Sequence, residues 1–232
     1  RRPAGMSVEA FCDMLVEEFR ATIERVGAER IGAFVAEPVQ ASGGVIVPPP
    51  GYLPRIRSLC RDNDILYISD EVVTGFGRVG TVFASGEVFD IEPDIITFAK
   101  GVTSGYFPLG GMMVSERLLA DLRRSNHPDA MYAHGLTYSS HPTGCAVALA
   151  NLDLLEGGIL EHVNEVAPYF QERLKSLEEL ALVGEVRGIG LMACVECVAD
   201  RESRNPLKLD YEVGKRIDAH CHELGLLVRP LI

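Results

Sequence analysis

Positive charge is scarce in this sequence of 232 residues. Lysine and arginine together number 22 against 33 aspartates and glutamates, which gives a formal net charge of −11. A surface this acidic repels phosphate backbones unless a basic stripe compensates, and only short pairs such as Arg123-Arg124 occur. We therefore expect small-molecule partners and no nucleic acid.

Long apolar segments are missing as well. No uninterrupted apolar run reaches the roughly 18 residues needed to cross a bilayer. The first five residues, Arg1 to Gly5, also lack the apolar stretch of a signal peptide. These absences predict a cytoplasmic protein that does not bind a membrane.

The six cysteines form no framework, and scattered cysteines are typical of buried thiols. Cys194 and Cys197 have a spacing found in metal sites. They fall in a predicted strand, however, where residues three apart point to opposite faces. The run His220-Cys221-His222 is typical of a helix surface. We therefore predict no metal site.

The sequence is 47% hydrophobic and 24% charged, which is sufficient for a substantial core. Apolar residues at helical spacing predict an amphipathic helix from Val8 to Val26. After it, short apolar runs alternate with helical segments, which indicates an α/β fold with a mostly parallel sheet and helices on both faces. The four runs are residues 31–35, 65–69, 95–99 and 111–114.

From His141 to Leu155 the spacing of apolar residues again predicts a helix, which continues in pieces to Leu180. Residues 184–198 then predict a strand pair or a bent strand, 209–224 a helix, and 226–228 a strand that ends at Arg229. We divide the chain into part of a large domain (1–150), a connecting helical segment (151–180) and part of a smaller α+β domain (181–232).

Three polar residues follow the first three apolar runs directly: Glu37, Asp70 and Lys100. Ligands bind beyond the carboxyl ends of the strands in open α/β sheets, so we expect a site there. A competing motif, Gly75-x-Gly77-x-x-Gly80, matches the dinucleotide-binding pattern. No apolar helical period follows it, so we interpret these glycines as a tight loop beyond the site.

A lysine before a glycine and an acid on the neighbouring strand suit pyridine chemistry. The amine can act as a nucleophile, and the acid can keep a pyridine nitrogen protonated. The surrounding residues resemble the class III aminotransferases, which are pyridoxal 5'-phosphate enzymes of fold type I. The resemblance rests on the segments 70–78, 97–101, 108–111 and 134–138, with Gly105 and His141-Pro142.

The resemblance implies a role for each matching residue. Lys100 would form the Schiff base with the cofactor, and Asp70 would pair with the pyridine nitrogen. Val72 would stack on the ring, and Thr137 would contact the cofactor phosphate of the neighbouring subunit. A homodimer with a shared active site is therefore expected, and whether dimers pair into tetramers stays open.

Members of this family are longer than this chain. Their glycine- and serine-rich phosphate-binding turn, and an aromatic residue that covers the ring, precede the matching segment. The last part of their small domain follows it. The resemblance therefore implies a chain truncated at both ends.

The subfamily prediction depends on Ser42, Val73 and Arg229. Several relatives have at the position of Val73 a glutamine that bonds to the ring hydroxyl, and this sequence lacks it. Relatives that act on ornithine or 4-aminobutyrate have a glutamate where this sequence has Ser42, a candidate substrate-binding residue. Ser42 lies five residues after Glu37, and we interpret Glu37 as a supporting residue. Arg229 matches the arginine that binds a substrate carboxylate, which a guanidinium can hold bidentately. The pattern is closest to ω-amino acid or amine:pyruvate aminotransferases, which move an amino group from an amine donor to a keto acid.

Two alternatives remain open at this stage. A 4-aminobutyrate or ornithine aminotransferase, an aminomutase of the glutamate-semialdehyde type, or a decarboxylase-type member of the class would use the same cofactor. A mutase needs no external keto acid. A non-catalytic module on this fold would form no Schiff base at Lys100.

Overall fold

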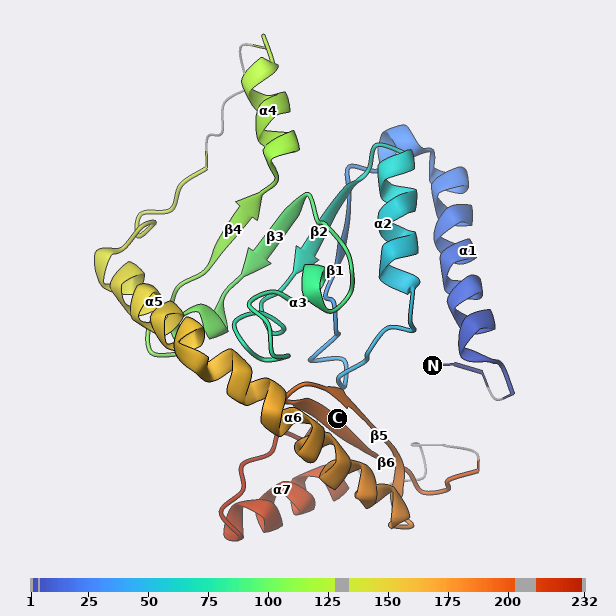
Figure 1. Ribbon diagram of the computed structural model, residues 1–232. Helices are drawn as coiled ribbons and strands as arrows, with labels where there is room; N and C mark the ends of the chain where they lie inside the picture. Colours follow the sequence, from blue (N-terminus) through green and yellow to red (C-terminus); the bar gives the residue numbers. More distant parts are fainter. Residues whose placement is uncertain (1, 4, 128–133, 203–211, 231–232) are drawn as a thin grey trace.

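A computed structural model describes residues 2–3, 5–127, 134–202 and 212–230. Its central feature is a four-stranded sheet in the order β1-β2-β3-β4 (Figure 1). The strands β1, β2 and β3 run parallel, and β4 closes one edge antiparallel to β3. The α/β architecture with a mostly parallel sheet is thus confirmed. The strands are Ala33–Ala36 (β1), Leu66–Asp70 (β2), Ile95–Phe98 (β3) and Gly111–Val114 (β4).

Two helices, α1 (Val8–Val26) and α2 (Tyr52–Asp62), cover one face of this sheet (Figure 1). The helix α1 begins where the Ser7 hydroxyl accepts a hydrogen bond from the Ala10 amide, as expected of an N-cap. It ends at Gly27, whose φ of 91° suits glycine. Its bounds are those predicted from the apolar spacing.

The core beneath α1 and α2 is built around aromatic residues of the first two strands. Phe34 and Tyr67 face each other with ring centroids 5.5 Å apart, and Phe19 of α1 packs on Phe34 at 5.0 Å. Tyr67 is fully buried, and this burial raises the pKa of its hydroxyl. Val35 points to the opposite face and is 62% exposed within the described part of the chain.

Shorter helical elements connect the strands and lead away from them. They are the 3₁₀ turns η1 (Ala28–Arg30) and η2 (Lys100–Thr103) and the helices α3 (Ala84–Glu87) and α4 (Glu116–Arg124). The helix α4 follows β4, and the Ser115 hydroxyl caps it by accepting from the Leu118 amide.

A long helical stretch crosses below the sheet in Figure 1. It consists of α5 (Pro142–Leu154), the π-helical turn η3 (Leu155–Ile159), α6 (Leu160–Lys175) and the 3₁₀ turn η4 (Ser176–Glu179).

By length and composition, Pro142–Glu179 is the one helical stretch among the described residues that could cross a membrane. Its best window has a mean hydropathy of 1.3 and is 22% buried. Leu149 and Leu154 of α5 are 63% and 61% exposed.

The second unit contains a hairpin of β5 (Val183–Ile189) and β6 (Met192–Cys197), followed by α7 (Val213–Glu223). The hairpin confirms the predicted strand pair. The predicted strand at 226–228 is wrong, because the described backbone there pairs with no other strand. An isolated extended segment cannot satisfy its backbone hydrogen bonds as a sheet does. Part of the helix predicted at 209–224 lies outside the described residues.

Candidate active site

The parallel order of β1, β2 and β3 brings their carboxyl ends to one edge of the sheet. Asp70 is the last residue of β2 and is paired in register with Thr97 of β3. Glu37 follows β1 directly, and Lys100 lies two residues beyond β3. In Figure 1, this edge faces the side on which α5, α6 and the β5–β6 hairpin lie. The expected convergence of two carboxylates and one amine at this edge is therefore consistent with the topology.

Lys100 has an unusual backbone conformation. Its φ is 42°, a left-handed value that costs free energy for a residue with a side chain. The side chain is exposed, and among the described residues none forms a hydrogen bond or ion pair with its amine. A strained residue with an unpaired amine at the end of a strand is the arrangement expected of a functional lysine.

The turn that carries Lys100 packs tightly against the glycine loop at residues 75–80. A Cβ added at Gly101 would lie 2.9 Å from the Cβ of Phe76, so a side chain cannot fit there without a shift. The rings of Phe76 and Phe98 are 5.5 Å apart, in an edge-on arrangement. This aromatic contact packs the end of β3 against the glycine loop.

Asn151 of α5 anchors the same turn and was not identified from the sequence. Its amide nitrogen donates to the carbonyls of Gly101 at 2.9 Å and Val102 at 3.2 Å. Its amide oxygen accepts from the Ser104 hydroxyl at 2.6 Å. A single asparagine within the apolar run of residues 145–152 was the signal in the sequence.

Asp70 keeps most of its hydrogen-bonding capacity. It is half-buried, and its Oδ1 accepts from the Val72 amide at 3.0 Å. Within the part of the chain that the structure describes, no other group bonds to this carboxylate. Asp70 can therefore accept one more hydrogen bond from a ligand.

The next residue, Glu71, is fully buried and fully used. Its Oε2 accepts from the Thr74 hydroxyl at 2.6 Å and from the Ala84 amide at 3.0 Å. Its Oε1 accepts from the amide of Ser85 at 2.7 Å and from the hydroxyl of the same residue. Glu71 thus fixes the loop between β2 and α3, a role that the sequence did not reveal.

The glycine motif at residues 75–80 forms turns, and no helix begins within it. This confirms its interpretation as a tight loop. It contacts the tip of the hairpin. The Leu191 amide donates to the Arg78 carbonyl at 3.0 Å, and a Cβ added at Gly190 would lie 2.5 Å from the Cα of Val79. Asn164 of α6 also donates to the Gly80 carbonyl, at 2.9 Å.

Glu37 and Ser42 lie in the segment that follows β1. The Glu37 carboxylate accepts from the Ala41 amide at 3.1 Å, so it stabilises the start of this loop. Ser42 is exposed in the turn that follows. These positions agree with a supporting role for Glu37 and leave the Ser42 hydroxyl accessible.

The remaining candidates are less closely associated with this edge. Val72 is half-buried beside Asp70. Thr137 is exposed in a turn before α5, and Arg229 is exposed in the irregular segment after α7. Among the described residues, no hydrogen bond or ion pair joins Thr137 or Arg229 to Lys100 or Asp70, so their roles stay predictions.

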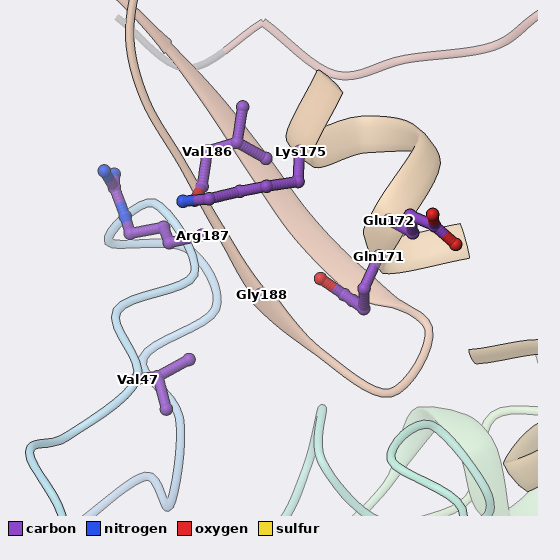
Figure 2. Close-up of a pocket in the computed structure, with 7 residues that line it drawn as sticks. All are labelled: Val47, Gln171, Glu172, Lys175, Val186, Arg187 and Gly188. Atoms are coloured by element: carbon purple, nitrogen blue, oxygen red, sulfur yellow. The ribbon is translucent and has the colours of Figure 1, made fainter. Parts of the chain in front are cut away.

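Two cavities of the described part of the chain are lined by other residues. One, of about 410 Å³, lies between α6, β5 and the loop after β1 (Figure 2). The other, of about 390 Å³, lies along α7.

Comparison with known proteins assigns the chain to a family. The family model described as Aminotransferase class-III matches residues 4–231. The chain is therefore a member of the class III aminotransferases.

Several relatives resemble the chain closely. An (S)-enantioselective ω-transaminase from Thermomicrobium roseum is 46% identical with a TM-score of 0.90, over 98% of this chain and 50% of that one. A PLP-bound amine transaminase from an uncultivated Pseudomonas species is 41% identical with a TM-score of 0.93, over 100% and 52%. The mitochondrial gamma-aminobutyrate transaminase 1 of Oryza sativa subsp. indica is 38% identical over 97% of this chain and 44% of its own length.

The chain thus spans about half the length of the relatives it matches. Class III aminotransferases use pyridoxal 5'-phosphate, and the donor set at the sheet edge fits that group. An unpaired amine can bond to its aldehyde, and a carboxylate with a free acceptor can bond to its ring nitrogen.

Proposed function

We propose that this protein is a pyridoxal-phosphate-dependent aminotransferase that moves an amino group from an ω-amino acid or another amine to a keto acid such as pyruvate. The observation that carries the proposal is the pair formed by Lys100 and Asp70. In a chain of this family, an acid with a free oxygen ends one strand, and an unpaired lysine with a strained backbone follows the adjacent parallel strand.

Each residue has a defined task in this proposal. When bound, the cofactor ring takes up the electron pair left when a proton leaves the donor carbon. Asp70 holds a proton at the ring nitrogen, which increases this capacity. The Lys100 Nζ is the attachment point of the cofactor, and as a free amine it moves the proton from the donor carbon. Arg229 holds the carboxylate of the keto acid.

The proposal includes a second copy of the chain. Thr137 would reach the cofactor phosphate of the partner, and several large apolar side chains of the described residues are exposed. They include Tyr106, Leu136, Tyr138 and Leu149, at 87%, 71%, 80% and 63%. Side chains of this kind are typical of a subunit interface. We propose a homodimer on this basis.

The division into domains and the location are also proposals. The four-stranded sheet lies within residues 1–150, and the β5–β6 hairpin lies within 181–232. The helical stretch between them supports residues 151–180 as the connection. We propose a cytoplasmic location; the name of the rice relative places that protein in mitochondria.

One experiment tests the central assignment. The full-length protein is reduced with borohydride in the presence of pyridoxal 5'-phosphate, and the modified peptide is mapped by mass spectrometry. We expect the cofactor mass on Lys100 and none in a Lys100→Ala variant, together with loss of essentially all turnover. A label on another lysine, or substantial transamination by the variant, would reject the assignment.

A donor panel separates the candidate reactions. Consumption of arylalkylamines that depends on pyruvate supports the proposed reaction. A preference for 4-aminobutyrate would favour the second candidate, which the rice relative supports by name. Turnover without any keto acid would indicate an aminomutase.

A further inference from the structure

The loop after β1 is held in a closed shape. Gln40 and Ile46 exchange two backbone hydrogen bonds, of 3.1 and 3.0 Å, and so join the two ends of the segment 40–46. Within it, the amides of Gly44 and Val45 both donate to the Ala41 carbonyl at 3.1 Å. We call this segment the 40–46 loop. Ser42 lies at its turn.

A residue from the other unit of the chain contacts this loop. Arg187 of β5 donates from Nε to the Gly44 carbonyl at 2.7 Å. Its Nη1 forms ion pairs with Glu196 of β6 at 2.6 Å and with Glu185 at 3.3 Å. The side chain is only 21% exposed. Figure 2 shows Arg187 extending from the hairpin toward the loop.

The chemistry of this contact requires arginine. A guanidinium has five N–H donors in a fixed plane, so one edge can bind a carbonyl while another binds a carboxylate. A lysine ammonium is a compact charge and cannot span both partners in the same geometry. Gly44 has a φ of 106°, and an added Cβ would lie 2.8 Å from the Arg187 Nη2. The loop and the arginine are therefore fitted to each other.

The contact joins two parts of the chain that are 143 positions apart. Val39 and Val45, at the two sides of the loop, are buried in a cluster that also contains Met192 of β6. The apolar cluster fixes the base of the loop to the hairpin. The hydrogen bond from Arg187 then sets the backbone two residues after Ser42.

We propose that Arg187 is a positioning residue for the donor side of the active site. It holds the 40–46 loop so that Ser42 faces the part of the amine donor that carries no carboxylate. This inference rests on the proposed function, because it takes Ser42 as a substrate-facing residue. It adds that the small unit sets donor specificity through one side chain that does not itself touch the substrate.

The structure offers a matched control in Lys175 of α6. Lys175 lines the same cavity as Arg187 (Figure 2). Its amine donates to the Val186 carbonyl at 3.3 Å and pairs with Glu178 at 2.7 Å, so it anchors the same strand. Among the described residues, it forms no hydrogen bond or ion pair with the 40–46 loop. Substitution of either Arg187 or Lys175 would therefore loosen the hairpin, whereas only substitution of Arg187 would also release the 40–46 loop.

The test compares Arg187→Met, Arg187→Lys and Lys175→Met in the full-length holoenzyme. Steady-state kinetics use an arylalkylamine as donor and pyruvate as acceptor, and hydrogen exchange follows the loop amides. For Arg187→Met we expect the KM for the amine to rise about tenfold, because without this hydrogen bond only about one molecule in ten would hold the 40–46 loop in position for the donor. The kcat should stay within about twofold, since a loss of ground-state positioning raises KM alone.

The other readouts should separate positioning from folding. The loop amides of Arg187→Met should exchange faster, while cofactor content and the KM for pyruvate stay unchanged. Arg187→Lys should recover part of the affinity for the amine. Lys175→Met should leave loop exchange and the KM for the amine at their wild-type values.

Two results would overturn the inference. One is a KM for the amine that changes equally in Arg187→Met and Lys175→Met. The other is unchanged exchange of the loop amides in Arg187→Met. If Arg187→Met does not fold, the same two comparisons with Arg187→Lys decide. A wild-type protein without transaminase activity would instead refute the proposed function.

Discussion

Asp70 and Glu71 are neighbours in sequence with the same charge, yet their surroundings are opposite. Glu71 is fully buried and accepts hydrogen bonds from Thr74, Ala84 and Ser85. Asp70 is half-buried and accepts one, from its own turn. Successive residues at a strand end point to opposite sides, so one acid faces the core and the other faces the open edge. Of these two acids, only Asp70 keeps an oxygen with which it can bind a ligand.

The substitution Asp70→Asn gives the strongest test of this comparison. The amide keeps an oxygen for the Val72 amide but cannot hold a proton at a pyridine nitrogen. We expect turnover to fall at least about a hundredfold, whereas the free energy of unfolding changes by less than about 1 kcal/mol. Single-turnover kinetics and urea unfolding of the full-length protein measure the two quantities. Wild-type turnover in this variant would remove Asp70 from the active site.

The substitution Glu71→Gln should give the reverse pattern. One acceptor oxygen is replaced by an amide nitrogen that faces buried donors, so we expect a loss of about 2–3 kcal/mol in unfolding free energy. Lys100 of this variant should still bind the cofactor at urea concentrations below the midpoint of its unfolding. Glu87→Gln is the control, because Glu87 is exposed in helix α3, to which the Glu71 carboxylate is hydrogen-bonded. Equal stability of the two variants would show that the Glu71 network contributes little.

Local pattern was sufficient for most of the framework. The apolar spacing of α1 predicted its bounds, and the runs at 65–69 and 95–99 predicted β2 and β3 within one residue. The strand at 226–228 was wrong because a strand needs a neighbour, and pairing is not local information.

The site itself was only partly accessible from the sequence. Strand ends predicted that Glu37, Asp70 and Lys100 share one edge, because parallel order places carboxyl ends together. Glu71 and Asn151 were missed for a common reason. Their partners, at Ser85 and Gly101, come close only after the loops fold, so no spacing in the sequence reveals them. The contact between Arg187 and Gly44 has the same origin.

A third carboxylate, Asp94, lies at the amino end of β3 and extends the comparison to the opposite edge of the sheet. Its Oδ1 accepts from Arg117 at 2.7 Å and from Arg57 at 3.2 Å, and its Oδ2 accepts from the Tyr67 amide at 2.9 Å. Burial by itself would raise the pKa of Asp94. The hydrogen bonds from Arg117 and Tyr67 and the nearby arginine charges outweigh it, so the pKa is lowered. Like Glu71, this acid stabilises the fold.

The smallest expected effect concerns the pH dependence of that stabilisation. A carboxyl whose pKa is lower in the folded state stabilises the fold above its unfolded pKa of roughly 4, and the contribution disappears as the pH falls through the folded value. Asp94→Asn should therefore cost about 1 kcal/mol of unfolding free energy at pH 7, and less with increasing acidity below about pH 4. Asp62→Asn, at an exposed acid, is the control. A difference between Asp94→Asn and wild type that stays constant down to about pH 3 would mean that packing, and not charge, holds Asp94 in place.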